Sequence, residues 1–220
     1  MATPRLFRLK AEVAPAPSGP VAESLPVAKV RVDTGVFHLD QLYDYSVPAK
    51  LSALVKVGVR VQLPFGGRET EGLVVSRVSA PDRAGELKSI TKILSPHAVA
   101  NPQSLELIDR ASEFYCCNPW DLIRSAIPPR VASVDKDFVS GEPSPQMGSK
   151  GAIEFHALAP FTQAHEQLVP LVAAHQKAGS ILIVAPDEKD VDLVIASLRS
   201  AALSPLKLTA ALTREQRYRN

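Results

Sequence analysis

The sequence contains few of the residues that build disulfide scaffolds, metal sites or membrane spans. It has two cysteines, which are adjacent at 116 and 117, whereas a disulfide scaffold or a zinc site needs several spaced ligands. None of its five histidines forms a metal-binding pair in the sequence. No apolar run is long enough to cross a bilayer, and the N-terminus lacks the apolar core of a signal peptide. We therefore expect a cytoplasmic protein with no cofactor, in which Cys116 and Cys117 pack as small side chains.

Aromatic residues are also scarce, at 5% of the 220 residues, so few rings are available to stack on nucleobases. The formal net charge is +2, which does not by itself indicate a nucleic-acid-binding protein. The charge is unevenly distributed, because residues 27–98 hold ten Lys/Arg against seven Asp/Glu, and residues 99–220 hold twelve against fourteen. The front half is therefore mildly basic, as expected of a surface that faces phosphate.

The front half has the pattern of a small antiparallel β-structure. Alternating apolar and polar residues, with turn residues between them, predict strands at 27–32, 42–47, 57–63, 70–78 and 89–94. Several short strands of this kind are typical of a small barrel or sandwich.

Helical spacing replaces the strand pattern after residue 100. It predicts a helix that begins near Pro102 and ends before Asn118, and a second helix from Trp120 to Ile127. Residues 131–151 are rich in glycine and proline and predict a linker with a domain boundary.

The last section alternates helix and strand. Helices are predicted at 164–177 and 187–200, and buried parallel strands at 180–185 and 206–210, before a short helix that begins at Thr213. Two parallel strands are too few for a well-covered sheet. We therefore expect an incomplete α/β domain and a chain that is a truncation of something longer.

The predicted fold is α+β, with a small N-terminal β-barrel, following helices and a truncated α/β segment. Its five parts are a flexible tail at 1–26, the barrel at 27–98, a helical connector at 99–130, the linker at 131–151 and the incomplete domain at 152–220.

The strand at 42–47 contains a candidate binding site, Tyr43-Asp44-Tyr45. On a strand the two rings point to one face and the carboxylate to the other. A ring can stack on a nucleobase, and a carboxylate accepts from exocyclic N–H groups. The alternative is structural, with both rings in the barrel core and Asp44 as a turn acceptor.

Two further places could contact phosphate. Gly66 and Gly67 allow positive φ and the close approach of a ligand, and Arg68 follows them, although an ordinary hairpin turn has the same pattern. Lys88 precedes the last predicted barrel strand and could neutralise a phosphate, or it could be a solvated lysine that discourages edge pairing.

The order of these segments resembles the start of the PriA family of replication-restart proteins, the primosomal proteins N′. The resemblance covers about residues 27–130, and it depends on the ordered set rather than on any single piece: 27–30, 38–40, 43–48, 58–66, 72–75, 87–90 and 108–115.

The resemblance implies a β-barrel that binds the 3′ end of a nascent strand at a stalled or branched DNA fork. The pocket of the family corresponds to Tyr43, Asp44, Tyr45, Gly66 and Lys88, with tyrosine at 43 in place of the usual phenylalanine. It also implies primosome proteins and single-strand-binding proteins as partners.

The family continues into an ATP-dependent 3′-5′ helicase domain with zinc-binding cysteines, and this chain departs from that plan. A Walker A loop needs Gly-x-x-x-x-Gly-Lys-Ser/Thr, but residues 156–163 contain neither glycine nor lysine. Residues 181–187 and 208–217 still resemble the next helicase segments. The combination of these segments with a missing Walker A loop resembles the actinobacterial branch of the family, whose members lack recognisable ATPase motifs. We therefore expect DNA binding without ATP, zinc or catalysis. The alternatives are a protein-interaction barrel and an active helicase.

Overall fold

A computed structural model describes residues 19–137, 153–177 and 179–220. The chain divides into two compact units, 1–137 and 138–220, and the division lies inside the predicted linker. The described part of the predicted linker, 131–137, forms a short helix, α3 (Ala132–Asp137), that was not predicted. Residues 138–151 of the predicted linker and residues 1–18 of the predicted tail lie outside the described residues. No described helix is long and apolar enough to cross a membrane.

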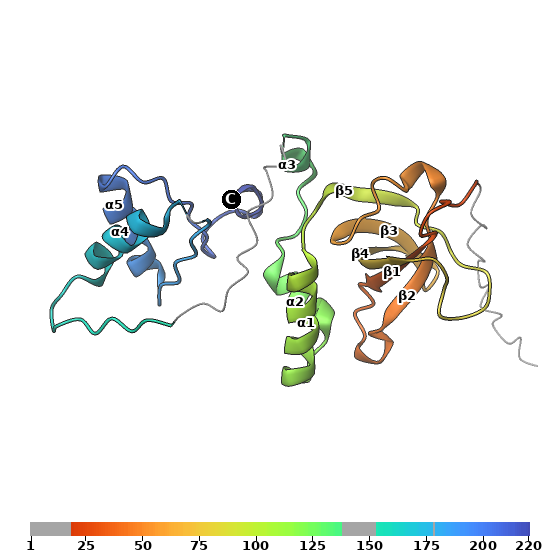
Figure 1. Ribbon diagram of the computed structural model, residues 1–220, viewed down its shortest axis with the longest axis horizontal. Coiled ribbons are helices and arrows are strands. Elements are labelled where there is room, and N and C mark those ends of the chain that lie inside the picture. Colours follow the sequence, from red (N-terminus) through yellow and green to blue (C-terminus); the bar gives the residue numbers. More distant parts are fainter. Residues whose placement is uncertain (1–18, 138–152, 178) are drawn as a thin grey trace, which may run out of the picture. The chain divides into compact units, whose positions relative to one another are not determined.

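The front unit contains an antiparallel five-stranded sheet, drawn in orange to yellow-green in Figure 1. Its strands are β1 (Val27–Val32), β2 (Leu42–Ser46), β3 (Val59–Phe65), β4 (Arg68–Val78) and β5 (Lys92–Ala98), in the spatial order β2-β1-β4-β3-β5. All five correspond to predicted strands, although β5 begins later than expected and runs further toward the C-terminus.

The strand pairing is that of an open sheet with β2 and β5 at its edges. One isolated parallel bridge, between Ser46 and Ser89, connects the free edge of β2 to the segment before β5. The Ser46 amide donates to the Lys88 carbonyl at 2.8 Å, and the Ile90 amide donates to the Ser46 carbonyl at 3.1 Å. The predicted strands are confirmed, and a ladder that would close them into a barrel is not formed by the described residues.

Both faces of the sheet bury apolar residues, which form two clusters. Successive side chains of β4 point to opposite faces and so contribute to both clusters. Val74 lies in a cluster formed within the curved sheet, with Val30, Val61, Leu63 and Tyr45. The adjacent Leu73 belongs to the second cluster, which the helices cover with Leu105, Ile108, Trp120 and Ile123.

The helices of the second cluster are α1 (Pro102–Tyr115) and α2 (Pro119–Ala126), both close to their predicted bounds. Each begins with an asparagine cap, since the Asn101 side chain accepts from the Ser104 amide and the Asn118 side chain from the Trp120 amide. The two cysteines do not pack together in a core. Cys116 ends α1 in the left-handed conformation with φ of 51° and is exposed, because the chain must turn there toward α2.

An arginine on the sheet forms ion pairs with the β1–β2 connection and with α1. Arg31 on β1 pairs with Asp40 at 2.8 Å and with Asp109 of α1 at 2.7 Å. Asp40 follows a short 3-10 helix at Phe37–Leu39, and a second such helix lies at Ala49–Leu51. The sheet, the β1–β2 connection and α1 therefore share one ionic network.

The end of the predicted flexible tail is paired with the sheet. The Ala22 amide donates to the Val47 carbonyl at 2.9 Å, and Ala22 is buried. The Arg77 guanidinium donates to the Leu25 and Ser24 carbonyls on one side and to the Ser52 carbonyl on the other. Residues 19–26 consequently belong to the front unit, because their backbone groups find partners in it.

The back unit has helices at α4 (Ala164–His175), α5 (Glu188–Ser200) and α6 (Arg214–Arg219), close to the predictions. The two predicted parallel strands, 180–185 and 206–210, are wrong for the described residues, since neither segment is a strand. A buried parallel strand needs neighbouring strands to pair with, and the described residues of the back unit supply none. The described part of the expected truncated α/β segment is therefore observed as helices joined by segments without regular secondary structure.

Candidate nucleic-acid interface

Asp44 lies directly opposite Lys29, because β2 and β1 pair in the register Tyr43–Val30, Asp44–Lys29 and Tyr45–Ala28. The alternation of the strand puts Asp44 and Lys29 on the face away from the rings, as the sequence predicted for Asp44. Their side chains are only 13% and 16% exposed, and the Lys29 Nζ lies 3.4 Å from Asp44 Oδ1.

The loop after β4 also reaches Asp44. The backbone amide of Asp82 donates to Asp44 Oδ2 at 2.7 Å, and the Asp82 carboxylate accepts from the Lys29 ammonium. The hydrogen bond to Asp82 is the main reason that the pKa of Lys29 is raised, with Asp44 adding to it. Lys29 is therefore held protonated between two carboxylates.

Tyr45 is a core residue rather than a surface platform. Its ring is 3% exposed and belongs to the inner cluster of the sheet. Its hydroxyl donates to the Pro64 carbonyl at 3.1 Å, and burial raises the pKa of this hydroxyl. The structural alternative for this ring is the one observed, so Tyr45 supports the site through the position of β2 and does not offer a stacking face.

Tyr43 lies beside the β3–β4 turn. Its ring contacts Phe65 edge-on, with centroids 4.9 Å apart, and its hydroxyl donates to the Leu39 carbonyl at 2.9 Å. Phe65 is followed by Gly66 and Gly67, whose φ values of 57° and 80° confirm the predicted positive-φ turn. A Cβ at Gly66 would meet no atom within 4 Å, so the space above this turn is open.

Lys88 and Arg68 are exposed, and neither pairs with an acidic side chain in the described part of the chain. The carbonyl of Lys88 bonds to the Ser46 amide, so the Lys88 backbone lies two residues along β2 from Asp44. Arg68 is paired across the hairpin with Phe65. The exposure of both side chains fits a phosphate contact and a solvated surface residue equally, so the phosphate contacts stay a prediction.

The predicted residues thus gather around β2 in two groups. Asp44 and Lys88 adjoin the outward face and free edge of the strand, and Tyr43 adjoins the glycine turn that carries Gly66. Sequence reasoning missed Lys29 and Asp82. The alternation of β1 could have shown that Lys29 points outward, but only the register shows that it faces Asp44. The described residues contain no group of side chains that could hold a metal ion.

Comparison with known proteins identifies the family of the front unit. Residues 29–128 match the family model described as the PriA 3′ DNA-binding domain. The front unit belongs to this family. The matched residues of the PriA-type domain include the whole sheet from the middle of β1 onward, together with α1 and α2.

Two mycobacterial proteins named PriA match a longer stretch of this chain, and a Bacillus protein named PriA matches a shorter one. The probable replication restart protein PriA of Mycobacterium tuberculosis is 28% identical over 207 residues, which cover 83% of this chain and 32% of that protein. Its counterpart in Mycobacterium leprae is 26% identical over 82% of this chain. The replication restart protein PriA of Bacillus subtilis is 36% identical over 66 residues, or 30% of this chain. The chain spans about a third of the length of its mycobacterial relatives.

Proposed function

We propose that this chain binds DNA at stalled or branched replication forks and recognises the 3′ end of the nascent strand. The observation that carries the proposal is the match of residues 29–128 to a 3′ DNA-binding domain, whose strand β2 holds an outward carboxylate at Asp44. Asp44 accepts from the base edge of the terminal nucleotide. The open turn at Gly66 admits the backbone, and Lys88 and Arg68 contact phosphate.

We also propose that the chain acts without driving unwinding. The segment before α4 has no glycine or lysine with which to hold nucleotide phosphates. The protein then holds fork DNA for primosome and single-strand-binding proteins to act on. DNA-stimulated ATP turnover by the purified chain would contradict this part of the proposal.

The recognition of a 3′ end can be tested with two forks that differ in one group. Fluorescence anisotropy at fixed salt compares a fork with a free 3′ hydroxyl and the same fork with a 3′ phosphate. We expect the free end to bind on the order of tenfold more tightly, because a tight pocket for the terminal nucleotide excludes the blocking group. Equal affinity for the two forks would refute end recognition.

Two substitutions separate the roles of the site residues. Asp44→Asn should remove the preference for the free end, whereas Lys88→Ala should weaken both forks and lower the slope of affinity against salt by about one. Lys189→Ala is the matched control, because Lys189 is an exposed lysine of the back unit.

A protein-interaction module is the second candidate, favoured by the many unrelated roles of small β-domains. It predicts that Asp44→Asn and Lys88→Ala leave DNA affinity unchanged while the thermal unfolding curve of each variant stays that of the parent protein.

A further inference from the structure

Lys29 and Asp44 form an adjacent donor and acceptor on the outward face of β1 and β2. The strand register makes them direct neighbours, and the Lys29 Nζ lies 3.4 Å from Asp44 Oδ1. Cross-strand neighbours on one face are held close by the sheet itself. The pair is therefore preformed by the backbone and does not require a conformational change in the strands.

Asp82 contacts both members of this pair at once. Its backbone N–H donates to Asp44 Oδ2 at 2.7 Å, and its carboxylate accepts from Lys29. One residue thus presents a donor to the acidic member and an acceptor to the basic member. Its own side chain is 75% exposed, so the contact lies at the surface, where solvent or a ligand can replace it.

A nucleobase offers the same combination. Adenine presents an N–H donor beside a ring-nitrogen acceptor, cytosine presents an amino donor, and guanine and thymine present carbonyl acceptors with N–H donors on their pairing edges. A carboxylate beside an ammonium can therefore bind the exposed edge of any unpaired base. This suits a site that must accept a DNA end whatever its sequence.

We infer that Lys29 is a second base-contacting residue beside Asp44, and that Asp82 occupies this donor–acceptor pair until the terminal base of a DNA strand replaces it. The inference rests on the proposed function, since it assigns the ligand of the Asp44 site. The Lys29 ammonium donates a hydrogen bond to an acceptor atom of the base and so holds the base beside Asp44. The Asp82 segment moves off Asp44 and Lys29 when DNA binds.

The displacement of Asp82 is tested by Asp82→Ala in the full chain, with Glu86→Ala as a control for charge. Glu86 is an exposed acid in the same connection between β4 and β5, so both variants remove one negative charge from this loop. We expect Asp82→Ala to tighten binding to the free 3′ end by about threefold to tenfold without changing the blocked fork by the same factor. Equal effects of the two variants on both forks would overturn the displacement.

The role of Lys29 is best measured where Asp82 no longer contacts it. In the Asp82→Ala background, Lys29→Met should weaken binding to the free 3′ end about tenfold and leave the blocked fork nearly unchanged. If Lys29 contacts only phosphate, both forks lose affinity and the salt slope falls by about one. That result, or no loss at all, would overturn the assignment. Lys29→Gln, which keeps a donor, should restore part of the affinity and shows that the loss does not come from misfolding.

These outcomes can be distinguished from failure of the proposed function. If the unsubstituted chain binds free and blocked ends equally, end recognition itself is refuted. Only the present inference is refuted if the chain prefers the free end and loses the preference in Asp44→Asn, while Asp82→Ala behaves as Glu86→Ala and Lys29→Met leaves binding to the free end unchanged.

Discussion

Similar apolar runs are buried in strands in the front unit but are exposed and outside strands in the back unit. In the front unit, Val61, Leu63 and Val74 are fully buried within strands that pair on both sides. In the back unit, Leu182 and Val184 are 85% and 83% exposed in a segment with no strand partner. Only two apolar residues of its described part, Val194 and Leu198, are buried. An apolar run therefore forms a strand only where other segments of the folded chain cover it.

The largest expected effect on stability comes from shortening a buried side chain in the core of the front unit. Leu63→Ala should lower the free energy of unfolding of the front unit by about 2–5 kcal/mol, because it leaves a cavity beside residues that cannot relax into it. Urea unfolding followed by the fluorescence of Trp120 measures it, since the single tryptophan is buried in the front unit.

The matched change in the back unit is Leu182→Ala, for which we expect a change within about 0.5 kcal/mol. Far-UV circular dichroism monitors it, because the back unit contains no tryptophan. A loss comparable to that of Leu63→Ala would show that residues 180–185 are covered in solution and would remove the contrast between the units.

A smaller effect is expected where the sheet meets the chain that leads to α1. Gly58 has φ of 80°, and an added Cβ would lie 1.8 Å from the Ala100 carbonyl oxygen. Gly58→Ala should therefore cost about 3 kcal/mol, because a backbone atom cannot rotate out of the way. Gly66→Ala, which meets no atom within 4 Å, should cost only about 1 kcal/mol for its positive φ. Equal midpoints for the two variants in the same urea experiment would show that the Gly58–Ala100 contact is not close.

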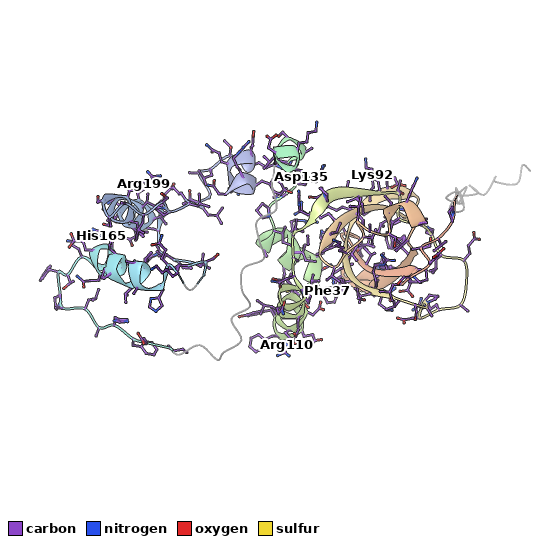
Figure 2. The ribbon with its side chains drawn as sticks, turned by 45° about the horizontal axis from the view of Figure 1, so that its top comes forward. Phe37, Lys92, Arg110, Asp135, His165 and Arg199 are labelled. Carbon is purple, nitrogen blue, oxygen red and sulfur yellow. The ribbon has the colours of Figure 1, made fainter. Side chains whose placement is uncertain are left out.

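The smallest of the three effects tests whether the helices and sheet of the front unit unfold together. Arg31→Met should cost about 2 kcal/mol, since Asp40 stays largely buried without its cation while Asp109 reaches water. Arg110→Met is the control, because Arg110 lies on the exposed surface of α1, where it is labelled in Figure 2. Among the described residues its ion-pair partner is Glu106 of the same helix. A circular dichroism transition that is present in Arg31→Met, absent from both the parent protein and Arg110→Met, and not seen by tryptophan fluorescence would contradict a single cooperative front unit.

The fold of the front unit could largely be predicted, and that of the back unit only in its helices. Alternation identified all five strands. Helical spacing identified α1 and α2, with Pro102 marking the start of α1 and Asn118 its end. Thr213 marked α6, where it forms a capping box with Gln216. The segment at 206–210 could not be placed by pattern. Its Lys207 pairs with Asp192 and Glu188 of α5, and such contacts with a helix are not visible in a period-two pattern.

The DNA-binding role of the candidate site stays a prediction. The sequence pointed to Asp44, Lys88 and the positive-φ turn at Gly66. In the structure Lys88 and Gly66 are exposed, whereas Asp44 is largely buried beneath Asp82. Tyr45 could not be assigned from the pattern, because alternation says that two rings share a face but not which face is buried. Burial of Tyr45 is decided by the strands that pack beneath it.

The sequence by itself determined the local elements of this protein, its mildly basic front half and its resemblance to a family, because these depend on neighbouring residues and on composition. The tertiary structure alone decided that Lys29 faces Asp44, that Asp82 covers both, and that the apolar runs of the back unit remain without strand partners. These are contacts between residues far apart in the chain. A one-residue change of register would reverse the face of every side chain on a strand while leaving the sequence pattern the same.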